Sequence, residues 1–188
     1  MNEDDKNIKF KTRKPLLYIS MVSMAMFFAG LTSGYIVRKG EGNWFEFDLP
    51  FYFSLSTLII LLSSFTIHKA ILNAKLNNFS SISNYLFFTL ILGLMFSFFQ
   101  FLGWREMYDM GIYFTGNGSH ASGSFVYAIT LMHLLHIVAG LVTIFIMYLN
   151  SRNKRYSSNN ILGLELGVTF WHFLDVLWIF LFVFLLVV

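Results

Sequence analysis

Long apolar segments separated by short polar stretches dominate the sequence. A helix needs about 20 mostly apolar residues to cross the hydrocarbon core of a membrane, and five segments reach this length. They predict membrane-spanning helices at about residues 16–37, 51–72, 85–104, 124–149 and 161–188. Pro15 is expected in the first turn of the first helix, where a missing backbone N–H costs little. The predicted fold class is all-α: a polytopic bundle of five transmembrane helices at residues 16–188, preceded by a basic tail at residues 1–15.

The composition excludes soluble classes of protein. Hydrophobic residue types make up 56% of the chain and charged residues 12%, with a mean hydropathy of +0.64. A soluble domain carries about 25% charged residues, so this chain cannot cover a water-facing surface. The absence of cysteine excludes disulfides, iron–sulfur clusters and thiolate copper sites.

Positive residues are distributed unequally between the two ends of the predicted spans. The end that holds the N-terminus carries Lys6, Lys9, Lys11, Arg13, Lys14, Lys69, Lys75, Arg152, Lys154 and Arg155. The opposite end carries Arg38, Lys39 and Arg105. The positive-inside rule therefore predicts a cytoplasmic N-terminus and an outside C-terminus. The net charge of +3 is too small to indicate a nucleic-acid partner.

Ionisable residues inside a span are costly, so they usually face a bundle interior or another protein. In the last span, Glu165 and His172 are seven residues apart, about 20° around the helix axis, and Asp175 lies within about 80° of both. We interpret them as one hydrogen-bonded stripe at a helix–helix interface, with direct proton handling as the alternative.

The fourth span places His133, His136 and Gly140 on one face. A small residue beside two imidazoles favours a closely packed partner helix. The alternative is haem ligation, because His136 and His172 have similar predicted depths in the membrane. In the third span, Gln100 is expected to bond to a neighbouring helix, while Trp104 with Arg105 is typical of an anchor at the membrane interface. We assign no catalytic, cofactor-binding or metal site to this chain.

The second half of the chain carries an ordered series of motifs. Two are the pattern His-x-x-His-x-x-x-Gly in the fourth span and the pattern Trp-His-Phe-x-Asp-x-x-Trp in the last. In this order they resemble the cytochrome c oxidase subunit III family of haem–copper oxidases. The residues that carry the resemblance, with a structural role by analogy, are Gln100, Glu106, His133, His136, Gly140, Glu165, Trp171, His172, Asp175 and Trp178.

The resemblance implies a non-catalytic integral subunit of a proton-pumping terminal oxidase of the aa3 type, located in a bacterial cytoplasmic membrane. Such a subunit packs against subunit I and supports its stability and proton uptake, while haem and copper are held by subunits I and II. Bound phospholipid, contact with membrane lipids and membership of a larger respiratory supercomplex are further expectations.

Two departures from the family limit the resemblance. Family members commonly have seven spans, and this chain lacks counterparts of the first two, which form one arm of a lipid-filled cleft. A buried glutamate of the first retained helix is also replaced here by Met24. Three alternatives stay open: subunit III of a quinol oxidase, a stand-alone b-type cytochrome that uses His133, His136 and His172, and a small secondary transporter. The missing internal repeat disfavours the last.

Overall fold

The computed structural model describes residues 3–42, 44–76, 78–116, 118–153, 156 and 161–188. Within these ranges the secondary structure consists of helices without strands. The helices are α1 (Glu3–Gly40), α2 (Phe51–Lys75), α3 (Phe79–Asp109), α4 (Ala121–Arg152) and α5 (Leu162–Val187). Each is long and apolar enough to cross a membrane. The predicted fold class of five transmembrane helices is confirmed.

Four of the helices extend beyond the predicted spans, and the largest difference is in α1. This helix begins at Glu3 and contains Pro15 in its interior, so the placement of Pro15 in a first turn is wrong. Proline removes one backbone hydrogen bond but fixes a helical φ angle, and the helix continues on both sides of it. The boundary predicted at residue 15 therefore falls inside a continuous helix.

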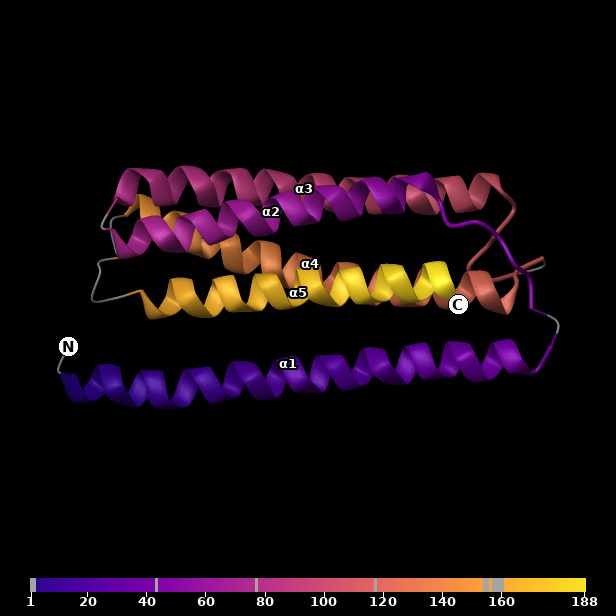
Figure 1. Ribbon diagram of the computed structural model, residues 1–188, viewed down its shortest axis with the longest axis horizontal. Helices are drawn as coiled ribbons and strands as arrows, with labels where there is room; N and C mark the ends of the chain where they lie inside the picture. Colours follow the sequence, from indigo (N-terminus) through magenta and orange to yellow (C-terminus); the bar gives the residue numbers. More distant parts are fainter. Residues whose placement is uncertain (1–2, 43, 77, 117, 154–155, 157–160) are drawn as a thin grey trace.

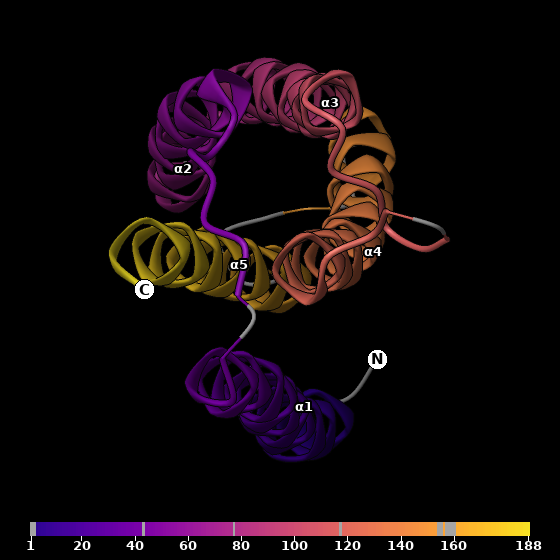
Figure 2. The same ribbon diagram turned by 90° about the vertical axis from the view of Figure 1, so that its right-hand side faces the viewer.

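Helices α2, α3, α4 and α5 form a closed ring, and α1 lies outside it (Figures 1 and 2). Around the ring, each helix packs against the next, and α2 packs against α5 to close it. Helix α1 packs only on α4 and α5 among the described helices. The chain therefore consists of a four-helix bundle with one peripheral helix.

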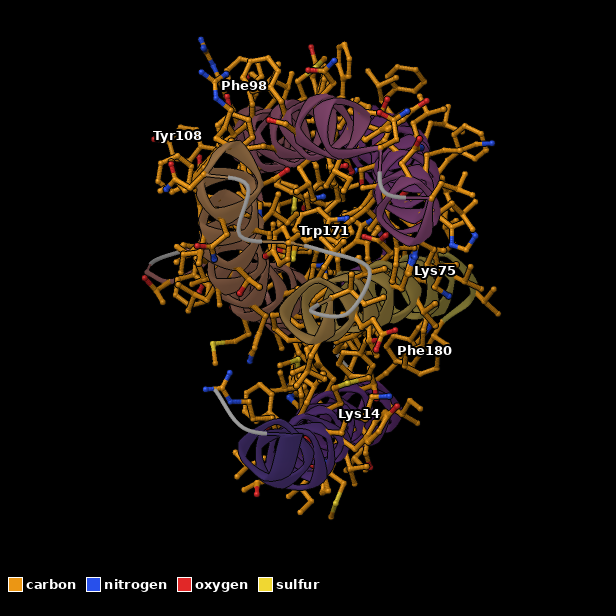
Figure 3. All side chains as sticks on the ribbon, turned by 90° about the vertical axis from the view of Figure 1, so that its left-hand side faces the viewer. Lys14, Lys75, Phe98, Tyr108, Trp171 and Phe180 are labelled. Atoms are coloured by element: carbon orange, nitrogen blue, oxygen red, sulfur yellow. The ribbon has the colours of Figure 1, made fainter. Side chains whose placement is uncertain are left out.

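Glycines allow close contact between the ring helices. A Cβ atom on Gly140 of α4 would lie 2.9 Å from side-chain atoms of both Leu174 and Trp171 of α5. A Cβ atom on Gly93 of α3 would lie 2.9 Å from the same Trp171 ring. Trp171 is fully buried and lies inside the ring, whereas Phe180 of α5 points outward (Figure 3). The close packing predicted at Gly140 is confirmed.

The order of the helices places most basic positions at one end of the bundle. The start of α1, the end of α2 with the start of α3, and the end of α4 with the start of α5 share this end (Figure 1). Lys14 lies in the first half of α1 and Lys75 in the last turn of α2, whereas Arg38, Lys39 and Arg105 belong to the opposite end. Lys154 and Arg155 lie outside the described residues. The distribution matches the sequence expectation, and the cytoplasmic side of the N-terminus stays a prediction.

Candidate functional site

Helix α2 carries pairs of hydroxyl side chains that face the interior of the ring. Ser56 and Thr57 are followed seven residues later by Ser63 and Ser64, a spacing of about two helical turns. Ser56 and Thr57 each donate to the carbonyl oxygen of Phe53 at 2.8 Å, and Ser63 donates similarly one turn back along the helix. Because these hydroxyl protons are already used, the oxygen atoms are available as acceptors. We call these four residues the hydroxyl ladder.

Helices α3 and α5 supply N–H donors to the hydroxyl ladder. Gln100 Nε2 of α3 donates to Ser56 Oγ at 2.9 Å. From α5, Trp171 Nε1 donates to Ser63 Oγ at 3.0 Å. Trp178 Nε1 donates to Thr57 Oγ1 at 2.9 Å. The bond expected from Gln100 to a neighbouring helix is therefore confirmed. Each bond satisfies a buried donor, which would otherwise cost about 1–3 kcal/mol, and together they fix the register of three helices.

The same arrangement joins α3 to α4. Trp104 Nε1 donates to Thr130 Oγ1 at 2.9 Å, and Thr130 donates its own proton to the Val126 carbonyl oxygen. Tyr127 donates to the Trp104 carbonyl oxygen at 3.1 Å. The Trp104 indole thus binds the neighbouring helix α4. Of the two residues expected to form an anchor at the membrane interface, only Arg105 is exposed.

His172 and Asp175 of α5 also face α2. Ser64 Oγ lies 2.6 Å from His172 Nδ1, and an Asp175 carboxylate oxygen lies 4.0 Å from the same nitrogen. The His68 and His172 rings are 6.0 Å apart between centroids. Asp175 is 2% exposed, and neither of its carboxylate oxygens has a hydrogen-bond partner among the described residues. The imidazole is therefore held by a serine, and the carboxylate is a buried acid beside it.

Glu165 does not join this pair. It lies in the first turn of α5 and forms an ion pair with Lys14 of α1 at 4.0 Å, with both side chains about one-third exposed. Seven residues correspond to about 10 Å along a helix axis, so Glu165 and His172 reach different neighbours although they share an angular position. The interpretation of Glu165, His172 and Asp175 as one hydrogen-bonded stripe is wrong.

The two histidines of α4 both contact α1. The His133 ring is fully buried and stacks on Trp178 at 5.1 Å between centroids. His136 Nδ1 lies 2.7 Å from the Met132 carbonyl oxygen, one turn earlier. Phe28 of α1 contacts both rings edge-on, at 6.2 and 5.6 Å. Because His172 faces α2 instead, the three histidines do not converge as the b-type cytochrome alternative requires.

A model of the family described as "Cytochrome c oxidase subunit III" matches residues 43–187 of the chain. This range contains α2 to α5 and all the contacts of the hydroxyl ladder. The chain belongs to the cytochrome c oxidase subunit III family. It is 34% identical over 179 residues to the probable cytochrome c oxidase subunit 3 of Rickettsia prowazekii, covering 90% of this chain and 61% of that protein.

Two other relatives of the cytochrome c oxidase subunit III family differ in length. The subunit 3 of Rhipicephalus sanguineus is 32% identical over 78% of this chain and 54% of its own length. The probable subunit 3 of Nocardia farcinica is 28% identical over 87% of this chain and 82% of its own length. The chain thus spans just over half of the length of the first two relatives and most of the third.

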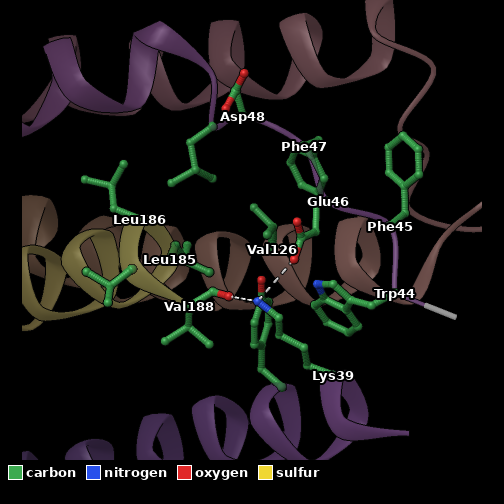
Figure 4. Close-up of a pocket in the computed structure, with 13 residues that line it drawn as sticks. Lys39, Trp44, Phe45, Glu46, Phe47, Asp48, Val126, Leu185, Leu186 and Val188 are labelled. Carbon is green, nitrogen blue, oxygen red and sulfur yellow. Dashed lines mark hydrogen bonds and ion pairs between the residues drawn. The ribbon is translucent and has the colours of Figure 1, made fainter. Parts of the chain in front are cut away.

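Two features of this chain were not predicted from its sequence. The hydroxyl ladder had a visible signal in the second span, where a Ser-Thr pair is followed seven residues later by a Ser-Ser pair, but hydroxyls scarcely change hydropathy. The second feature is a cavity of about 410 Å³ at the end of the bundle opposite the N-terminus (Figure 4). There Lys39 of α1 donates to the Val188 carbonyl oxygen and lies 3.7 Å from a Glu46 carboxylate oxygen. Lys39 thus connects α1, the α1–α2 connection and α5.

Glu106 is the motif residue with the least defined role. It lies near the end of α3, and one of its carboxylate oxygens is buried without a hydrogen-bond partner among the described residues. Each of the other motif residues makes a contact described above, mostly to a neighbouring helix. In the described residues no group of three or more His, Asp and Glu side chains is placed to hold a metal ion.

Proposed function

We propose that this chain acts as the non-catalytic subunit III of an aa3-type cytochrome c oxidase in a bacterial cytoplasmic membrane. In this role it packs against subunit I and supports the stability and proton uptake of the complex. Haem and copper are then held by subunits I and II, and membrane phospholipids contact the apolar surface of the chain. The N-terminus is cytoplasmic, because most positive residues lie at that end.

The observation that carries the proposal is the direction of the motif side chains. Gln100, Trp171 and Trp178 donate their N–H groups to hydroxyls of α2, so these groups are not available to a substrate. Trp178 additionally stacks on His133 inside the ring. Side chains used in this way hold helices together, which suits a scaffold subunit of an oxidase better than a catalytic one.

The test is affinity purification of the full chain from native membranes in mild detergent. We expect subunits I and II to co-purify, together with the haem a absorbance bands and the copper of the complex. The chain separated from these partners should show no Soret band. A Soret band in the separated chain, or co-purification without haem–copper subunits, would contradict the proposal.

An activity assay on the same preparation identifies the electron donor. Oxygen consumption driven by reduced cytochrome c, and not by a quinol, is expected for an aa3-type cytochrome c oxidase. The reverse preference would assign the chain to a quinol oxidase, the alternative that the sequence left open. Either result leaves the family membership unchanged.

A further inference from the structure

Two buried side chains inside the ring have polar atoms without a hydrogen-bond partner among the described residues. His133 of α4 is 0% exposed, and neither ring nitrogen has a partner; Gln100 of α3 is 1% exposed, and its Oε1 atom has none. The orientation of the Gln100 amide is fixed. Ser56 donates its proton to the Phe53 carbonyl oxygen, so it can only accept, and it accepts from Gln100 Nε2. Gln100 Oε1 is therefore the end of the amide that remains to be satisfied.

These two side chains lie at the same level of the ring. Trp178 stacks on His133 and donates to Thr57, the residue next to the Ser56 hydroxyl that holds Gln100. Phe96 lies one turn from Gln100 on the same face of α3. The Phe96 ring contacts the His133 ring at 6.1 Å and the Trp178 ring at 5.2 Å. All four ring helices thus contribute to one layer around His133.

We propose that this layer is a binding site for ordered water, which hydrogen-bonds to His133 and to Gln100 Oε1. A neutral imidazole presents one donor and one acceptor, and an amide oxygen presents an acceptor. Water supplies both complementary functions, and buried waters typically bind such otherwise unsatisfied groups through about three hydrogen bonds each. A cation does not fit, because the ring contacts of His133 are aromatic and no described cluster of ligands surrounds it.

With this site, the interior of the ring would contain water at the level of Trp178 but none at the level of Trp171. Trp171, two turns from Trp178 on α5, is equally buried, and its N–H is bonded to Ser63. It packs against Gly93 and Gly140, which carry no polar side chain. Trp171 and Trp178 are therefore a matched pair of buried indoles, of which only Trp178 contacts the proposed water site.

Pulsed X-ray hydroxyl-radical labelling with mass spectrometry tests the proposal on the full complex in mild detergent. Radicals generated from bound water oxidise adjacent buried side chains, so Trp178 and Phe96 should be oxidised several-fold more than Trp171. The Gln100→Leu/His133→Leu double variant should reduce the labelling of Trp178 to that of Trp171. Thr89→Val, which alters another buried hydroxyl of α3, should leave it unchanged.

Two results would overturn the proposal. In the unaltered complex, equal labelling of Trp178 and Trp171 would show that the layer is dry, and this comparison requires no variant to fold. Labelling of Trp178 that persists in an assembled double variant would show that the radicals arise from water not held by His133 and Gln100. If the double variant does not assemble, Gln100→Leu alone should still lower the labelling of Trp178.

Discussion

Helix α1 and the ring of α2 to α5 have similar apolar sequences but are held in different ways. In the apolar 18-residue segment of each helix, 11% of residues are buried in α1, compared with 33–39% in the other four. The ring is closed by N–H donors that bind hydroxyls, whereas α1 is attached near its ends by Lys14 and Lys39. Between them, Phe28 and Tyr35 are its fully or largely buried aromatic contacts. The match to the family model, residues 43–187, likewise covers the ring and leaves out α1.

The difference shows what specifies a position inside a membrane protein. Lipid is as apolar as leucine, so apolar residues alone give a helix little reason to prefer a neighbour over lipid. Close contact at small residues and buried hydrogen bonds provide that preference. The ring has both, and α1 has few of either. We therefore expect changes in the ring to disrupt folding and equivalent changes in α1 to be tolerated.

The largest effect is expected from filling a glycine contact in the ring. Gly140→Leu places a side chain where even a Cβ atom would lie 2.9 Å from Leu174 and Trp171, and overpacking typically costs about 1–3 kcal/mol or more. The yield of assembled complex and its thermal stability should fall strongly. Gly30→Leu is the matched control on α1, because no heavy atom lies within 4 Å of its Cβ position. Equal losses for both variants would remove the distinction between the ring and α1.

A smaller effect is expected from removing one bond of the hydroxyl ladder. Trp171→Phe keeps the aromatic volume but removes the donor to Ser63, which should lower the free energy of unfolding by about 1–2 kcal/mol. The coupling between Trp171→Phe and Ser63→Ala in a double-mutant cycle should be about 0.6 kcal/mol, the average found for hydrogen bonds within membranes. Purely additive losses would show that the bond contributes no stability.

His172 tests whether the polar contacts of α5 serve assembly or chemistry. His172→Leu removes the partner of Ser64 and the imidazole nitrogen that lies 4.0 Å from an Asp175 carboxylate oxygen. We expect a reduced amount of complex, whose remaining molecules reduce oxygen at the normal rate per haem. A normal amount of complex without oxygen reduction would contradict the scaffold role. Ser64→Ala, which removes only the hydroxyl, should reproduce a weaker form of the same loss.

The smallest effect is expected at the ion pair between α1 and α5. Lys14→Ala should change stability by at most about 1 kcal/mol, because exposed ion pairs contribute little. Hydrogen exchange of the α1 backbone measures the change locally, and α4 serves as the internal reference. Glu165→Gln removes the same ion pair and should likewise change stability by at most about 1 kcal/mol. A large loss of complex in either variant would show that α1 depends on this contact.

The number and type of helices could be predicted because hydropathy reports directly on the segments that face lipid. The helix ends could not, because backbone hydrogen bonds continue a helix such as α1 into its polar flank, where hydropathy gives no signal. For Gln100, burial of an amide in a span already required a partner, but the identity of Ser56 depends on which helices are neighbours. Glu165 was misassigned because angular position on a helix does not report the distance along it.

The hydroxyl ladder has a consequence for how the chain enters the membrane. Ser56, Thr57 and Ser63 satisfy their own protons on the carbonyl groups of α2. At these three positions a lone α2 in lipid therefore exposes no unsatisfied hydroxyl donor, which a membrane interior would penalise. Helix α2 can therefore enter the membrane before its partner helix α5 has been synthesised. The tryptophans of α5, synthesised more than 100 residues later, then find acceptors already in place.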